Sequence, residues 1–182
     1  MRTVVLAAAI SCAGPGLTHA QPAQVEIRAP YVQTPPEAVS AMLELAAVAG
    51  GDVVYDLGAG DGRIVIAAVR RPGVRAVGIE LDPGRVRGAR EAAEKEGLGG
   101  RAEFLSQDFF EADLRGATVV TLFLLPDQNR KLRPKLWNEL KPGARVVSFC
   151  FDMGPEWKPE RQIEAAGCKI YRWRAPGPPA AE

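Results

Sequence analysis

An acidic residue and three glycines stand at alternate positions in the first half of the chain. The segment 53–68 reads VVYDLGAGDGRIVIAA and contains Asp56, Gly58, Gly60 and Gly62. Glycines permit a sharp turn and let a ligand approach bare backbone. The residues that follow are predicted to begin a helix, and a helix N-terminus favours anions and hydrogen-bond acceptors. A tight strand–helix turn that binds nothing is the alternative interpretation of so short a motif.

The spacing of this loop argues against a dinucleotide. The dinucleotide fingerprint requires GxGxxG, but the sixth position counted from Gly58 is Arg63. Asp56 would repel a pyrophosphate, and it suits a cationic group such as the ammonium of an amino acid. Glu80 ends the next apolar run and can accept both hydroxyls of a ribose. A ligand with a ribose, an ammonium and no phosphate chain points to S-adenosylmethionine.

Short apolar runs alternate with helical patterns along the chain. Strands are predicted at 53–57, 76–81, 102–106, 118–124, 144–151, 161–164 and 169–174, and helices at 37–48, 63–71, 83–96 and 128–140. This alternation predicts an α/β fold with a single doubly wound, mostly parallel seven-stranded sheet and a C-terminal antiparallel hairpin. Ligands of such sheets bind at the carboxyl ends of the strands, beside the first strand, where the glycine loop lies.

Three expectations concern helix ends and breaks. Thr34 is a plausible N-cap of the first helix, and Asp82 of the third. Pro134 lies within the last helical pattern, where proline removes a backbone hydrogen bond, so we expect it to bend the helix or to mark a restart.

The stretch from about residue 30 to residue 151 resembles the class I S-adenosylmethionine-dependent methyltransferases. Within that class it is similar to small prokaryotic protein-lysine methyltransferase-like proteins, related to the mitochondrial enzymes that methylate an ATP synthase subunit. The segments that carry the resemblance are PYVQTPPEAV, VVYDLGAGDGRIVIAA, GIELDP, FLSQDFFEADL, VVTLFLLPDQNRKLRPKLWNELKPGARVVS and FDMG. The resemblance implies a Rossmann-like methyltransferase fold, S-adenosylmethionine as cofactor and a protein lysine as methyl acceptor.

The resemblance also implies roles for residues on the cofactor side. Asp56, Gly58 and Gly60 would line the methionine end of the cofactor, and Asp61 and Gly62 of the same loop would also bind the cofactor. Glu80 would bind the ribose, Asp108 would meet the adenine amino group, and Phe109 would pack on the adenine ring. A turn cap is the alternative role for Asp108, because caps commonly use Asp.

On the acceptor side, the resemblance implies that Leu124, Leu125 and Pro126 form the mouth where the sulfonium faces the acceptor. Tyr31 and Thr34 of the N-terminal arm would close that mouth, and simple packing is the alternative role for Tyr31. An apolar channel lowers the pKa of a lysine amine by disfavouring the ammonium. The LFLLP segment lacks the Asn-Pro-Pro-aromatic pattern of enzymes that methylate planar nitrogens. Asp152 is a candidate base, with a loop cap before Gly154 as its alternative role.

The 182 residues fit one domain with a sizeable core. Residues 1–20 have the layout of a secretory signal, with Arg2, an apolar run and the small residue Ala20. A disordered or wrongly included extension is the alternative. We expect an arm at 21–34, the methyltransferase domain at 35–174 and a disordered tail at 175–182. Cleavage would remove His19, the single histidine, and with it any histidine base or histidine-bound metal.

These features indicate a periplasmic or secreted protein, or a cytoplasmic one if the leader is not a true signal. The net charge of +1 gives no basic field for nucleic acid. We therefore expect a monomer without bound metal, nucleic acid or membrane span, and with a protein substrate. Two alternatives are an exported S-adenosylmethionine-binding protein that has lost catalysis and a nucleotide-linked oxidoreductase, which Asp56 and Arg63 disfavour.

Two cysteines, Cys150 and Cys168, remain beyond the leader. In the seven-stranded order the last strand runs antiparallel beside the fifth, which brings the two cysteines close together. We hypothesise a disulfide, which requires an oxidising compartment. Two free buried thiols are the alternative.

Overall fold

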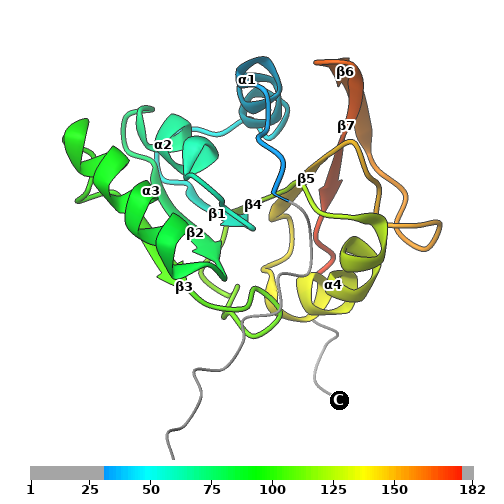
Figure 1. The fold of residues 1–182 in the computed structure, drawn as a ribbon. Coiled ribbons are helices and arrows are strands. Elements are labelled where there is room, and N and C mark those ends of the chain that lie inside the picture. The colour runs from blue at the N-terminus through cyan, green and yellow to red at the C-terminus, as the bar shows by residue number, and fades with distance from the viewer. Residues whose placement is uncertain (1–30, 178–182) are drawn as a thin grey trace, which may run out of the picture.

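The computed structural model describes residues 31–177, which form one seven-stranded sheet with helices on both faces (Figure 1). The strands are β1 (Val53–Leu57), β2 (Arg75–Glu80), β3 (Ala102–Ser106), β4 (Val119–Leu122), β5 (Arg145–Phe149), β6 (Arg161–Ala165) and β7 (Cys168–Arg174). The helices are α1 (Pro36–Leu45), α2 (Arg63–Val69), α3 (Pro83–Lys95) and α4 (Pro126–Glu139). The order is β3-β2-β1-β4-β5-β7-β6, and β7 is antiparallel to both of its neighbours. The predicted fold class is therefore confirmed.

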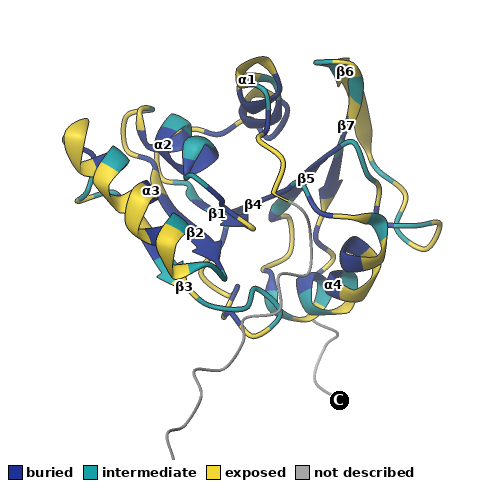
Figure 2. Ribbon diagram, viewed as in Figure 1, coloured by how far each residue is buried: buried dark blue, intermediate teal, exposed yellow. Residues whose placement is uncertain are grey.

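Two apolar cores lie on opposite faces of the sheet. Helices α1, α2 and α3 bury one face, through strand residues such as Val54, Ala76 and Val147. Helix α4 and the segment 112–117 cover the other face, over strand residues such as Val120 and Leu122. Figure 2 shows the central strands as buried, with the exposed residues on the outer sides of the helices. Parallel strands covered on both faces account for the near-continuous apolar runs in the sequence.

The structure differs from three local expectations. Pro35, and not Thr34, is the N-cap of α1, and the carbonyl of Thr34 accepts a hydrogen bond from Arg63 instead. Helix α4 runs from residue 126 to 139 without a restart at Pro134. Because Pro134 and Arg130 are both exposed, water can solvate the Arg130 carbonyl that loses its helical donor. Asp82 caps α3 as predicted, by accepting from the N–H groups of Gly84 and Arg85.

The start of the predicted tail is held against the sheet. Ala175 is buried, its N–H donates to the carbonyl of Ala144, and its carbonyl accepts from the N–H of Gly143. The expectation of disorder does not hold for Ala175, because backbone pairing and burial are not visible in composition alone. The predicted signal, residues 21–30 of the arm and residues 178–182 lie outside the described part of the chain.

Gly62 sits where the glycine loop meets α2, and replacing it with Ala is expected to destabilise the fold. Its φ is +79°, and an added Cβ would lie 2.6 Å from Phe104 Cε1 and 2.9 Å from Ala89 Cβ. We expect Gly62→Ala to cost about 2–4 kcal/mol, from left-handed strain plus overpacking. Gly97→Ala is the matched control, because φ there is +68° and no atom lies within 4 Å of the added Cβ. Urea denaturation should show the larger loss for Gly62→Ala; equal losses would contradict the packing part.

Candidate functional site

The carboxyl ends of β1, β2, β4 and β5 meet at one edge of the sheet. There they border a cavity of about 400 Å³. Its lining comes from the segment before α1, the glycine loop, the turns after β2 and β3, and the segments after β4 and β5. A smaller cavity of about 30 Å³ adjoins it under residues 31–34 and is lined by Asp56, Gly58, Gly60 and Asp61, among others. The two cavities share Tyr31, Val32, Gly58 and Phe123.

The glycine loop is shaped for close approach. Gly58 and Gly60 have φ of +82° and +55°, a backbone region that residues other than glycine rarely adopt. A Cβ on Gly60 would lie 2.4 Å from Tyr31 Cε2, and one on Gly58 would lie 3.1 Å from Leu124 Cδ2. Tyr31 therefore lies directly over the loop. A side chain at Gly60 would collide with the Tyr31 ring and one at Gly58 would press on Leu124, so glycine is required at both positions.

Asp56, the penultimate residue of β1, carries a buried carboxyl. Burial raises the pKa of Asp56 to about 7, the hydrogen bond from Thr121 opposes that shift, and the nearby carboxylates of Asp61 and Glu80 contribute to it. Thr121 Oγ1 donates to Asp56 Oδ1 at 2.7 Å. A carboxyl in this position is stabilised in its charged form by a cationic ligand group. The ammonium predicted for this place fits that requirement.

Glu80 ends β2 and joins two turns. Its Oε2 accepts from the N–H of Gly60 and its Oε1 accepts from the N–H of Asp82, both at 2.9 Å. The guanidinium of Arg85 lies 3.7 Å from Glu80 Oε1 and 4.3 Å from the centre of the Tyr31 ring. An ionised carboxylate has about four lone-pair sites, so Glu80 retains acceptor capacity for ribose hydroxyls.

The structure brings most of the predicted site residues to the two cavities. Tyr31, Gly58, Glu80, Asp108, Phe109, Leu124 and Leu125 line the larger one, and Asp56, Gly60 and Asp61 the smaller. Gly62 and Pro126 line neither of these cavities; Gly62 packs against α3 and β3, and Pro126 is the first residue of α4.

Two candidate carboxylates also act as caps. Asp108 Oδ1 accepts from the N–H of Phe110 at 2.9 Å, so its turn-cap role exists beside its place in the cavity wall. Asp152 is exposed and caps the N–H of Gly154 at 2.9 Å, which is the role expected of a loop residue. Nothing in its surroundings selects Asp152 as a base.

The side chains of the larger cavity that sequence reasoning missed include Arg85, Phe123 and Phe151. Arg85 is five residues beyond Glu80, in the first turn of α3, and this spacing was the only signal for it. Phe123 and Phe151 follow the ends of β4 and β5, where the fold class places ligand contacts without deciding which way a side chain faces.

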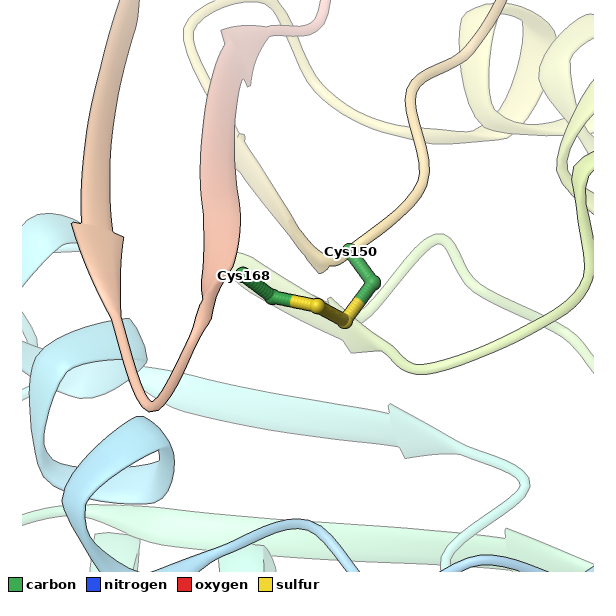
Figure 3. The surroundings of a disulfide bond; sticks show 2 residues. All are labelled: Cys150 and Cys168. Atoms are coloured by element: carbon green, nitrogen blue, oxygen red, sulfur yellow. A yellow bond between two sulfur atoms is a disulfide. The ribbon is translucent and has the colours of Figure 1, made fainter.

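Cys150 and Cys168 form a disulfide, with Cα atoms 5.0 Å apart. Figure 3 shows the bond joining the segment after β5 to the first residue of β7. The register that pairs Phe149 with Ile170 brings the two cysteines together, as the hypothesis required. Both cysteines line the larger cavity.

The described chain offers neither a metal site nor a membrane-spanning helix. Among residues 31–177, no group of histidine, cysteine and carboxylate side chains is arranged to hold a metal ion. Within the same range, no helix is long and apolar enough to cross a bilayer.

Comparison with known proteins agrees with this geometry. The sequence pattern of the ANTKMT methyltransferase domain matches residues 56–161. A protein-lysine N-methyltransferase from Saccharolobus islandicus (strain REY15A) is 50% identical over 136 residues, which are 74% of this chain and 84% of that protein. A human lysine N-methyltransferase named for a component of ATP synthase is 34% identical over 139 residues, 76% of this chain but 58% of the human protein.

A solved structure, described as an RNA methyltransferase from Salinibacter ruber in complex with S-adenosyl-L-homocysteine, is 54% identical. It superposes with a TM-score of 0.77 over 80% of this chain and 94% of that one. Together, the fold and the site define the class of S-adenosylmethionine-dependent methyltransferases. Within that class, the chain belongs to the ANTKMT methyltransferase domain family.

Proposed function

We propose that this protein transfers the methyl group of S-adenosylmethionine to the side-chain amine of a lysine in a protein. Relatives at 50% and 34% identity are named as lysine methyltransferases. The observation that carries the proposal is the chemistry of the cavity wall. Its charged lining residues, among those described, are Glu80, Asp82, Asp108 and Arg85, an excess of carboxylates. These carboxylates suit the cofactor, and the apolar remainder of the wall, lined by Phe123, Leu125 and Phe151, suits the alkyl chain of a lysine better than a phosphate polymer.

Different residues of the cavity bind the cofactor and the methyl acceptor. When bound, S-adenosylmethionine supplies a methyl group on a sulfonium that is its own leaving group. Asp56 would hold the ammonium, Glu80 the ribose, and Asp108 with Phe109 the adenine, all from elements anchored in the sheet. Such a transfer is in-line, so the chain contributes mainly position and exclusion of water.

The acceptor amine must be neutral to attack, and the apolar end of the cavity favours that state. Phe123, Leu124, Leu125 and Phe151 line it. Burial among apolar groups disfavours an ammonium and lowers the pKa of a lysine amine. The released proton can pass to water. This route requires no histidine base, and none is found within residues 31–177.

The proposal is tested by labelling. Full-length protein is incubated with methyl-labelled cofactor and a cell extract, which is then divided for protease or ribonuclease treatment. We expect the label to survive ribonuclease, to be lost to protease, and to appear by mass spectrometry as methyl-lysine. Label that survives protease and is lost to ribonuclease would overturn the lysine proposal in favour of an RNA acceptor, the activity named for the Salinibacter ruber protein.

We also propose that the protein works in an oxidising compartment, periplasmic or extracellular. The disulfide supports this proposal, because such bonds persist outside reducing compartments. The N-terminus of the protein purified from its native cells provides the test. Cleavage after Ala20 is the expected result, and an intact leader in the cytoplasmic fraction would contradict it.

A further inference from the structure

The larger cavity has two ends with different chemistry. One end carries the carboxylates of Glu80, Asp82 and Asp108. The other end is formed by the aromatic rings of Phe123 and Phe151 and by the Cys150–Cys168 disulfide. The cofactor roles proposed above occupy the first end. The second end is therefore left for the methyl acceptor.

The disulfide anchors an unusual turn in the cavity wall. Cys150 has a φ of +67°, in the left-handed region that residues other than glycine rarely adopt. The N–H of Phe151 donates to the carbonyl of Phe149 at 2.9 Å, which closes a three-residue γ-turn around Cys150. Such a conformation persists only where surrounding contacts hold it. Here the disulfide holds Cys150 at its centre, and the N–H of Cys150 donates to the carbonyl of Lys169 at 2.8 Å.

This turn sets the position of Phe151. The Phe151 ring lies almost parallel to that of Phe123, with 6.4 Å between centroids and 18° between planes. Phe149 contacts Phe123 edge-on, at 4.9 Å between centroids, and fixes that ring from the core side. On its other side the segment is held by Asn129 Nδ2, which donates to the carbonyls of Phe151 and Asp152, each at 3.2 Å. Phe151 is thus held between two anchors, Asn129 and the disulfide.

We propose that the Cys150–Cys168 disulfide is a positioning element of the methyl-acceptor subsite. It holds Phe151 opposite Phe123, so that the two rings and the bond itself receive the unbranched alkyl chain of the acceptor. The inference rests on the proposed function, because a lysine side chain is an unbranched alkyl amine. The rings offer apolar surface without hydrogen-bonding atoms, so the subsite favours methylene groups and a neutral amine.

Reduction of the disulfide should affect the two ends of the cavity differently. A dithiol reductant gives the disulfide two electrons and two protons, which leaves thiols on Cys150 and Cys168 while the reductant closes to a cyclic disulfide. Cys150 can then relax from its left-handed turn, and Phe151 moves with it. Asp56 and Glu80 lie on β1 and β2, away from this segment in the sheet order, and keep their positions. Acceptor binding should therefore weaken while cofactor binding persists.

The test compares oxidised and dithiol-reduced full-length protein. Alkylation and mass spectrometry first count free thiols at Cys150 and Cys168 in the oxidised sample. Calorimetry then measures the affinity for S-adenosylhomocysteine, which reports on the cofactor end. The second ligand is an analogue of the cofactor in which a nitrogen replaces the sulfonium and carries an unbranched aminobutyl chain. The factor by which it binds more tightly than the analogue with an N-methyl group, here called the aminobutyl gain, reports on the acceptor end and requires no activity.

We expect reduction to change the affinity for S-adenosylhomocysteine by no more than about twofold. The aminobutyl gain should decrease about tenfold, the scale of one lost aromatic contact. The KM for a lysine substrate should rise by a similar factor, with kcat changing less. Phe151→Ala, which keeps the disulfide, should reproduce the loss. Cys150→Gly with Cys168→Ser should recover part of it, because glycine adopts the turn unaided, whereas Cys150→Ser with Cys168→Ser should not.

Three results would overturn the inference: free thiols in the oxidised protein, an aminobutyl gain that reduction leaves unchanged, or an equal loss of S-adenosylhomocysteine affinity. The last would show that the bond stabilises the whole fold. The proposed function fails separately. If no lysine is methylated but the aminobutyl gain is present and sensitive to reduction, the subsite stands and the lysine acceptor falls.

Discussion

Replacing Asp56 with Asn is expected to weaken binding of S-adenosylmethionine about a hundredfold at pH 7.5, the scale of losing one partner of a buried ion pair. Asn keeps the size of the side chain and can still accept the hydrogen bond from Thr121, so the local structure should survive. What is lost is the charge that opposes the ligand ammonium. Isothermal calorimetry of both proteins measures the difference, and an affinity within about threefold of the original would contradict the assignment.

The pH dependence of binding follows from the raised pKa of Asp56, about 7 in the free protein. Below that pKa the carboxyl is protonated, and binding of an ammonium must first expel the proton. Affinity should therefore rise about tenfold per pH unit up to about pH 7, and fall again above about pH 8, where an α-amino group loses its own proton. Asp56→Asn should abolish the acid limb and leave the alkaline one.

The same substitution is expected to stabilise the free protein at high pH. The folded pKa lies above the ordinary value of 3.8, so the folded state binds the proton more tightly than the unfolded state does. Stability is therefore lost as pH rises from about 4 to about 7, by on the order of 4 kcal/mol. In urea denaturation, the unfolding free energy of Asp56→Asn relative to the original protein should be more favourable at pH 8 than at pH 4.5.

Asp61 in the same loop provides a control of opposite sign. The hydrogen bond from Arg63 holds its pKa below the ordinary range, so its ionised form stabilises the fold at neutral pH and that contribution is lost in acid. Asp61→Asn should therefore lose stability at pH 8 relative to about pH 2, because this contribution is present above the ordinary pKa of 3.8 and is lost only below it. If the stability of both variants changes with pH in the same direction, burial does not control the pKa of Asp56.

The strand ends of the site could be predicted from the sequence, because parallel strands end at one edge of the sheet. Asp56 and Glu80 each close an apolar run, and this pattern is sufficient to place them together. Residues whose place depends on loop geometry could not be predicted. Phe123 and Phe151 each follow a strand, and only the turns after those strands decide that the two rings meet.

The disulfide could be predicted only in part from the sequence. The strand order brings Cys150 and Cys168 to neighbouring strand ends, yet free thiols in a core would have the same sequence. The register of β5 against β7 and the left-handed turn at Cys150 decide the matter, and neither leaves a local signature. The expectation for Ala175 fails for a related reason, because its backbone pairs with Gly143 and Ala144, which composition does not reveal.

Tyr31 and Arg85 show what the site gains from side chains outside the glycine and acid motifs. Arg85 lies between the ring of Tyr31 and the carboxylate of Glu80. Tyr31 in turn covers Gly60, whose N–H donates to Glu80. Segment 31–34, the glycine loop and the first turn of α3 are therefore joined through Glu80. A change at this carboxylate should affect all three.

Glu80→Gln is accordingly expected to reduce both cofactor affinity and stability. Both carboxylate oxygens accept backbone N–H groups, from Gly60 and Asp82, so an amide must turn its NH₂ donor toward one of them. Leaving a buried donor unpaired costs about 1–3 kcal/mol of unfolding free energy. The ribose hydroxyls lose a charged acceptor as well, so S-adenosylhomocysteine should bind about a hundredfold more weakly, the scale of losing charge-assisted hydrogen bonds.

Asp82→Asn is the matched control, since Asp82 lines the same cavity but caps α3, a role that Asn fills equally well. The variant should bind S-adenosylhomocysteine within about threefold of the original. Its unfolding free energy should fall by at most about 1 kcal/mol, because Asn keeps the cap and loses only a partly exposed ion pair with Arg85. If Glu80→Gln behaves like this control, Glu80 does not hold the ribose. If only its stability falls, the carboxylate serves the two turns alone, and ribose recognition must come from another acceptor in the cavity.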